Sequence, residues 1–359
     1  MRHRVLAIIA ALAVVLWAPV QVAGQAPSGA AATKTKTTTK PPTVVETWTP
    51  PAPDDRPART PDGQPNLQGL WSQSASYAPL ERPAQFAGKP FFTEKEADEF
   101  VKNEANKIYE GDPGVHYKFT EYGEDKWQAG VVRNLRTSII VDPPDGRLPP
   151  LTPEAQKRGT IRSAGNPYWK GFPNYPFMGL YTRCVTGYWE GGGPMIRPGN
   201  PQGESIGAQG ETEILQTPGY VVIFTDSNND TRIIPLDGRP HLAPTTTKWF
   251  GDSRGHWEGE TLVVETTNFN EQVRVGGQMV KNMRLVERLT KRDANTILYQ
   301  FTVDDPTTWT KPWTGEVPWP RLKGPMYEAT CTEDNYGLLG VLKGEKFVEE
   351  AAAKQGVKK

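Results

Sequence analysis

The segment GDSRGHWEGETLVVETTNF, residues 251–269, concentrates side chains that could carry out acid–base chemistry. Carboxylates at Asp252 and Glu265, a guanidinium at Arg254 and an imidazole at His256 alternate with small or apolar residues. An arginine keeps a neighbouring carboxylate ionised, whereas apolar neighbours raise the pKa of a carboxyl group and suit it to general-base work. The segment therefore predicts either a proton-transfer site or a polar anchor for a ligand.

The same segment has the pattern of a β-hairpin, whose turn decides which side chains share a face. A two-residue turn at Glu258 and Gly259 would place Asp252 opposite Glu265, and directly opposed residues lie on one side of a sheet. One face would then carry a mixed set: Asp252, Arg254, His256, Val263, Glu265, Thr267 and Phe269. This face points either to solvent or into the lumen of a barrel. The apolar neighbours of Glu265 favour the lumen, where desolvation would raise its pKa.

Further polar candidates lie on both sides of this hairpin in the sequence. In DGRPH, residues 237–241, the simplest interpretation is a turn, and the alternative is a hydrogen-bonded Asp237 and His241 that supply an acid or a base. Alternation in RLVERLT places Glu287 between two leucines, either among apolar neighbours or at a rim. Nearby tryptophans form either edge packing or the wall of a ligand cavity: Trp309, Trp313 and Trp319.

Several familiar catalytic and metal-binding patterns do not fit. GESIG matches the nucleophile elbow of α/β hydrolases around Ser205, but the strand before it and the helix after it are missing. The histidines beyond the first residues are His116, His241 and His256, and their spacing is not that of a zinc site. No phosphate-binding glycine motif occurs either. The sequence thus implies neither a metal nor a cofactor.

Short apolar runs separated by turn residues must position these candidates. Their β-branched and aromatic content indicates strands, and their short connections favour antiparallel neighbours: TEILQ, GYVVIFTD, DTRIIPL, ETLVVETTNF, NMRLVERLT, TILYQFTVDD and PMYEATC. We therefore expect a mainly β fold over 211–345, an antiparallel up-and-down barrel that is lipocalin-like in outline.

The rest of the chain differs in composition. A charged start followed by an apolar run predicts a signal peptide over 1–26, and a threonine-, lysine- and proline-rich stretch predicts a disordered tether over 27–60. Residues 61–210 are rich in proline and glycine and predict an irregular segment that packs on the barrel. Two short helices are expected in it, one beginning at Thr93 and one over 151–158. Residues 346–359 are expected to form a tail.

Charge and cysteine content narrow the compartment and the partners. Lysine plus arginine equals aspartate plus glutamate at 41 each, so nothing favours nucleic acid, which would need a clustered basic surface. No second long apolar run indicates membrane insertion. The cysteines Cys184 and Cys331 predict a disulfide, with a catalytic or metal-binding thiol as the alternative. Together with the predicted signal peptide, these features lead us to expect a protein in the periplasm or secreted, with a small molecule as its partner.

Phrases spread over the chain beyond residue 60 resemble a large family of exported bacterial proteins of unknown function: TPDGQPNLQGLWS, RIIPLDGRPHL, GDSRGHWEGETLVVETTNF, FTVDDPTTWTKPWTGEVP and CTEDNYGLLGVLKG among them. The resemblance implies that the irregular segment and the strand-rich part form one unit, and it carries over no catalytic residue. Two departures from the family pattern are visible. FTDSNND replaces a histidine-containing segment, and His256 stands where the family has arginine.

Three functions are compatible with these residues. The leading one is binding of a small apolar or aromatic molecule in a barrel cavity, with ligand-binding candidates Asp252, His256, Glu287, Trp309 and Trp313. The second is a cofactor-independent hydrolase or isomerase, in which Glu265 or His241 is the general base and Arg254 stabilises an oxyanion. The third is a structural cell-envelope protein displayed on the tether.

Overall fold

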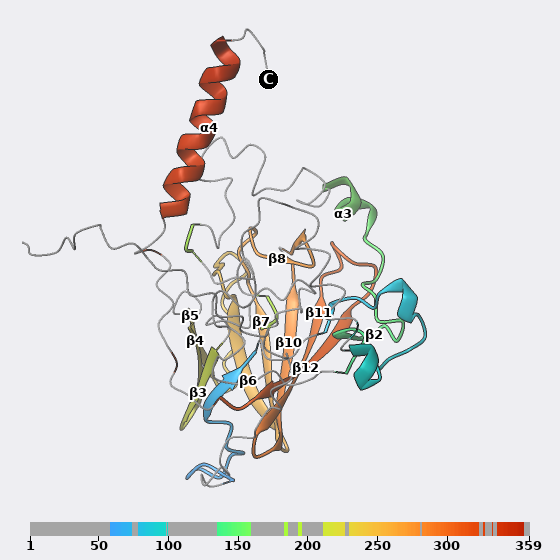
Figure 1. Ribbon diagram of the computed structural model, residues 1–359. Coiled ribbons are helices and arrows are strands. Elements are labelled where there is room, and N and C mark those ends of the chain that lie inside the picture. Colours follow the sequence, from blue (N-terminus) through green and yellow to red (C-terminus); the bar gives the residue numbers. More distant parts are fainter. Residues whose placement is uncertain are drawn as a thin grey trace, which may run out of the picture. The chain divides into compact units, whose positions relative to one another are not determined.

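The computed structural model describes the chain between residues 58 and 354, with gaps (Figure 1). The described ranges are 58–73, 78–97, 99, 135–158, 183–185, 193–195, 211–226, 230–280, 282–322, 326, 332 and 336–354. All of them belong to one unit of the chain, Val44–Lys359. The predicted signal peptide and almost all of the predicted tether lie outside the described residues.

Two antiparallel sheets and a small hairpin make up the β-structure of the described residues (Figure 1). The four-stranded sheet has the order β1-β3-β4-β5, with β1 at Gly69–Ser72, β3 at Glu211–Thr217, β4 at Tyr220–Thr225 and β5 at Asp230–Pro235. The six-stranded sheet has the order β2-β12-β11-β10-β7-β6, with β2 at Ile140–Asp142, β6 at Asp252–Glu258, β7 at Thr261–Thr267, β10 at Arg284–Asp293, β11 at Thr296–Asp304 and β12 at Trp313–Pro320. The hairpin pairs β8 at Arg274–Val275 with β9 at Gln278–Met279.

The prediction of a mainly β, antiparallel fold is confirmed, and strands joined by short connections are neighbours in the sheets. The described residues form two sheets, however, and not a closed barrel. The sheets adjoin at two places, because β5 lies beside β6 and Trp71 of β1 bridges to Arg321 directly after β12. Side chains of the two sheets therefore lie within reach of each other.

Strand β12 was not among the expected strands. Its sequence, WTGEVPWP, contains one glycine and two prolines, which weaken strand pairing. It pairs with β11 along its whole length, whereas β2 covers it only at Thr314 and Gly315. Pro318 and Pro320 lie beyond this covered part, in the kind of edge position where a strand tolerates proline.

Side chains from both sheets form one hydrophobic cluster, in which alternate residues of each strand take part. In β11 the alternating residues are all fully buried: Ile297, Tyr299, Phe301 and Val303. Glycine occupies two inner positions because neighbours fill the space of a side chain. A Cβ atom at Gly315 would lie 2.6 Å from Cε1 of Phe301, and one at Gly255 would lie 2.7 Å from Cδ2 of Leu236.

The segment 61–210 contributes β1 to one sheet and β2 to the other. The helix predicted at Thr93 begins with a capping box, since Thr93 N donates to Glu96 Oε2 at 2.8 Å and Glu96 N donates to Thr93 Oγ1 at 3.3 Å. The other helical elements are η1 at Ala84–Phe86, α3 at Pro153–Arg158 and α4 at Tyr336–Lys354. No helix in the described ranges is both long and apolar enough to cross a bilayer.

Candidate functional site

The hairpin β6–β7 turns at Gly259 and Glu260, since Glu258 pairs with Thr261. The expected turn lay one residue earlier, so the expected cross-strand pairs are wrong. Asp252, for example, pairs with Thr267. The pairing is offset by two residues from the expected one. Because side chains alternate with a period of two, this offset leaves each of them on the face that was predicted.

The sequence favoured a barrel lumen on the polar face of the hairpin, and this expectation is wrong. The other face, which carries Leu262 and Val264, joins the hydrophobic cluster. On the polar face the side chain of His256 is 60% exposed. Phe269 lies beyond the end of β7 and is buried in the hydrophobic cluster, and its backbone forms a bridge with Lys248. Phe269, one of the apolar residues that favoured a lumen, therefore belongs to the core and not to the polar face.

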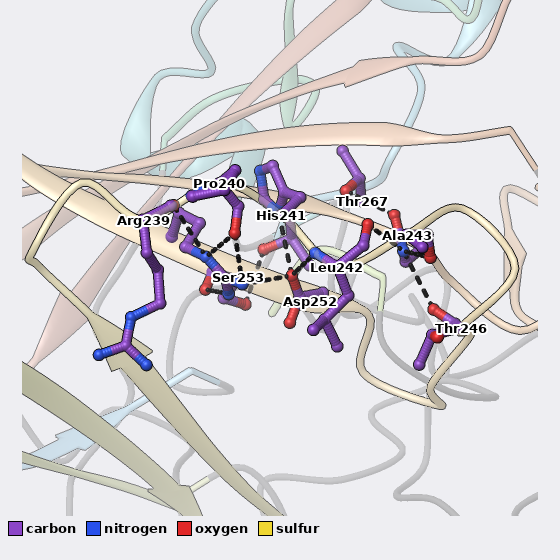
Figure 2. A network of polar contacts seen from close by, with 12 residues as sticks. Arg239, Pro240, His241, Leu242, Ala243, Thr246, Asp252, Ser253 and Thr267 are labelled. Atoms are coloured by element: carbon purple, nitrogen blue, oxygen red, sulfur yellow. Dashed lines mark hydrogen bonds and ion pairs between the residues drawn. The ribbon is translucent and has the colours of Figure 1, made fainter.

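Asp252 is the centre of a polar cluster beneath this loop (Figure 2). Its side chain is only 3% exposed and accepts hydrogen bonds from Leu242 N at 3.0 Å and Lys248 Nζ at 3.2 Å. Arg254 Nη2 lies 2.9 Å from the same carboxylate. Burial raises the pKa of Asp252, but these three donors outweigh it and lower the pKa to about 2. Asp252 is thus ionised, and Arg254 helps to keep it so.

His241 lies between two carboxylates. Its Nδ1 is 3.2 Å from Oδ2 of Asp252, and its Nε2 is 3.3 Å from Oε1 of Glu265. Asp237 forms an ion pair with Arg239 within the segment DGRPH, so the alternative that it works together with His241 is not supported. The structure does bring together four of the predicted residues on the outer side of the six-stranded sheet: His241, Asp252, Arg254 and Glu265.

The environments of two residues in this outer cluster do not suit the catalytic roles expected for them. Burial raises the pKa of Glu265, but Arg284 and His241 outweigh it and the pKa is lowered, opposite to the predicted direction. Arg254 donates to the carbonyl oxygens of Arg239, Pro240 and Ser253, in addition to its contact with Asp252. Its guanidinium therefore ties down the covering loop, which makes it a poor candidate for oxyanion stabilisation.

A second polar cluster lies on the inner side of the sheet, around Glu287. Glu287 is fully buried and pairs with Arg232 of β5, whose side chain is 9% exposed, through contacts of 2.9 and 2.5 Å. The hydroxyl of Tyr299 donates to Glu287 at 2.8 Å. Arg232 also donates to the hydroxyls of Ser253 and Thr266 at 3.2 Å each. This ion pair links the two sheets, and because Glu287 has no exposed surface it lies inside the fold and not at a rim.

The protonation states in the inner cluster follow from burial and from the charge of Glu287. Burial lowers the pKa of Arg232, but the neighbouring carboxylate outweighs it and the pKa is raised. Burial is the largest cause that raises the pKa of Tyr299 well above its ordinary value. Arg232 therefore stays charged, and Tyr299 stays a neutral hydrogen-bond donor. Its oxygen also accepts the N–H of Met195 at 2.9 Å.

Sequence reasoning found Glu287 but missed Arg232 and Tyr299. A signal for Arg232 exists, because alternation in DTRIIP places it on the same face as Ile234, which is fully buried, while Ile233 is 62% exposed. An arginine at an inward position of an apolar strand calls for a buried acid, and the alternation of RLVERLT supplies one. The alternation places these charges on inner faces, but only the fold pairs them.

A row of aromatic rings continues from Tyr299 along the inner face of the sheet. The aromatic row consists of Trp319, Tyr299, Phe301, Trp313 and Trp309, with successive ring centroids 4.5, 5.7, 5.6 and 5.7 Å apart. Each of the five is at most 1% exposed. Within the described part of the chain, the buried indole Nε1 atoms of the three tryptophans have no hydrogen-bond partner. Buried donors are normally paired, so these three atoms require an explanation.

Several predicted residues belong to neither the outer nor the inner cluster. Ser205, His116 and Cys331 lie outside the described residues, and the disulfide between Cys184 and Cys331 stays a prediction. The described residues contain no free cysteine. They also contain no cluster of three or more histidine, cysteine or acidic side chains that could hold a metal ion.

Comparison with known proteins gives no family for the chain. None of the protein-family models searched matches it, and no curated protein matches it. The resemblance to exported bacterial proteins therefore stays a prediction, and the function is inferred from the two clusters alone.

The outer cluster predicts a specific loss of stability in acid. Because the pKa of Asp252 is about 2 in the folded protein, below its ordinary value of 3.8, its contribution is fully present above about pH 4. It is lost as the pH falls from about 4 toward about 2, and its size is roughly 2 kcal/mol. Urea unfolding at a series of pH values should show that Asp252→Asn has a flatter pH dependence in this window. Glu154→Gln, which breaks an exposed ion pair with Arg158, should leave the wild-type slope nearly unchanged, and equal slopes for wild type and Asp252→Asn would contradict the assignment.

Proposed function

We propose that the protein binds a small aromatic or apolar molecule at the inner cluster, beside the aromatic row and the Glu287–Arg232 pair. The observation that carries this proposal is the set of buried indole donors without partners. An unpaired buried donor costs about 1–3 kcal/mol, and a buried ion pair seldom stabilises a fold more than apolar residues would. A ligand that accepts hydrogen bonds from the donors offsets part of this cost. Ligand binding would therefore account for the unpaired donors and the buried ion pair.

In this proposal the two sheets are the walls of a lipocalin-like site in an exported protein. Arg232 and Glu287 come from different sheets, so the pair holds the walls together at the site. Ser253 and Thr266 belong to the inner face of the β6–β7 hairpin, with their hydroxyl oxygens 2.9 Å apart. The β6–β7 hairpin thus contributes to the site through the face opposite the one that carries Asp252 and Glu265.

The outer cluster supports an enzyme less well. A general base benefits from a raised pKa, whereas the pKa of Glu265 is lowered. Both ring nitrogens of His241 lie against carboxylates, and Arg254 is bonded to the covering loop. These contacts suit a loop attachment, and we assign the outer cluster that role.

Binding of N-phenyl-1-naphthylamine, a neutral aromatic fluorophore, tests the proposal. Wild-type protein is expected to bind one equivalent with a blue-shifted emission, because the aromatic row provides apolar surroundings shielded from water. The variant Trp313→Leu removes a ring that is fully buried in the row, and its affinity is expected to fall by about 10-fold, which corresponds to about 1.4 kcal/mol. Fluorescence titration measures both affinities.

His256→Gln is the matched control, because His256 lies on the opposite face of the hairpin and its side chain is 60% exposed. Its affinity for the fluorophore should equal that of the wild type. Absence of saturable binding to the wild type, or equal affinities for Trp313→Leu and the wild type, would remove the support for an inner site.

A further inference from the structure

The unpartnered polar atoms on the strands of the inner site share one property, since all of them are hydrogen-bond donors. In the described strands β5, β6 and β12 they are Nε of Arg232 and Nε1 of Trp257, Trp313 and Trp319. Nε1 of Trp309, just outside these strands, extends the set. Buried acceptors without a partner also occur in the described residues, but they lie in β9, in the β10–β11 turn and after β11: Gln278, Asn295 and Asp305.

The acceptors at the centre of the inner site are already occupied. Oε1 of Glu287 accepts from Tyr299 and Arg232, and Oε2 accepts from Arg232 again. The hydroxyl oxygen of Tyr299 accepts from Met195 N. The hydroxyl oxygens of Ser253 and Thr266 accept hydrogen bonds from the guanidinium of Arg232. A ligand that brought its own donor to this centre would meet groups whose bonding capacity is largely used.

The charges at the centre are also balanced. Arg232 carries one positive charge and Glu287 one negative charge, and the two charges balance each other across contacts of 2.9 and 2.5 Å. An anionic ligand would enter a buried site with no unmatched cation and would approach the carboxylate of Glu287. Desolvation of such an uncompensated charge is costly. The site therefore disfavours carboxylates and other anions.

Resting on the proposed binding function, we infer that the ligand is a neutral aromatic carbonyl compound, with rings for the aromatic row and oxygen acceptors for its indole donors. On β5, β6 and β12 the unpartnered polar atoms are all donors, so a carbonyl oxygen finds a free partner there and an N–H or O–H group does not. A buried polar group left without a partner weakens binding by about 10-fold or more. Ligand selectivity should therefore follow hydrogen-bond acceptance.

Four bicyclic probes of similar shape test this inference by isothermal titration calorimetry. They are 1-indanone, which accepts; indane, which does neither; indole, which donates; and indane-2-carboxylate, which is anionic. We expect 1-indanone to bind at least 10-fold more tightly than each of the other three. In Trp313→Phe, which keeps a ring but removes one donor, the preference for 1-indanone over indane should fall several-fold while the affinity for indane stays close to that of the wild type.

The outcomes separate this inference from the function on which it rests. If none of the four probes binds, the binding function itself is contradicted. If 1-indanone and indane bind equally, or if indole or the carboxylate binds best, an inner site exists but the carbonyl assignment is wrong. Trp319→Phe provides a second variant should Trp313→Phe fail to fold, because its indole is also an unpartnered donor in β12. An unchanged preference for 1-indanone in the folded variants would also overturn the assignment.

Discussion

Replacement of Arg232 with methionine is expected to lower the free energy of unfolding by about 3–5 kcal/mol. The change removes the cation that faces Glu287, a carboxylate with no exposed surface. An uncompensated charge then remains between the two sheets, and the hydroxyls of Ser253 and Thr266 also lose the hydrogen bonds that Arg232 donates. Urea unfolding at neutral pH, followed by circular dichroism, measures the loss.

Two further variants show whether charge burial is the cause. Arg232→Met combined with Glu287→Met should recover most of the lost stability, because apolar replacement of a whole buried pair is often neutral or stabilising. Arg288→Met breaks a surface pair with Glu258, whose side chain is 48% exposed, and should cost less than about 1 kcal/mol. A double variant less stable than Arg232→Met alone would mean that the pair stabilises the fold in a way that burial does not explain.

The sequence predicted which side chains share a face of the β6–β7 hairpin, but it did not predict what lies against each face. Alternation sorted Asp252, Arg254 and Glu265 onto one side, and this sorting is insensitive to an offset of two residues in the pairing. Alternation cannot tell which side a loop will cover. The segment 236–250 covers the polar side through Asn268, whose Nδ2 donates to three backbone carbonyls. Local pattern therefore indicated a lumen where a loop attachment exists.

The inner site was harder to predict because its parts lie far apart in the sequence. Arg232 and Glu287 are 55 residues apart, and they meet only because β5 and β10 belong to different sheets that face each other there. Trp313 and Trp319 were recognised as candidate wall residues, but their strand was not, since proline and glycine obscure its pattern. Residue type indicated which side chains matter, whereas their combination depends on how the strands associate.

A side chain at position 315 is expected to destabilise the fold and the aromatic row together. The Cβ atom of Gly315→Ala would lie 2.6 Å from Cε1 of Phe301 and 3.0 Å from Cγ2 of Ile139. Phe301 has little room to retreat, since its ring lies 5.7 Å from that of Tyr299 and 5.6 Å from that of Trp313. Overpacking of this kind costs about 1–3 kcal/mol. Urea unfolding measures this cost, and titration with N-phenyl-1-naphthylamine should show weaker binding as the row shifts.

A double-mutant cycle assigns the loss to one contact. Phe301→Leu alone creates a gap and should also destabilise, but together with Gly315→Ala the smaller side chain accepts the new methyl group. The double variant should therefore lose at least about 1 kcal/mol less unfolding free energy than the two single variants lose in sum, because residues 301 and 315 are paired across β11 and β12. Gly340→Ala is the control, since a Cβ atom there in α4 meets nothing within 4 Å, and it should change stability by less than about 1 kcal/mol. Strict additivity in the cycle would show that Phe301 does not fill the space above Gly315, and the packing of the aromatic row would then need a different explanation.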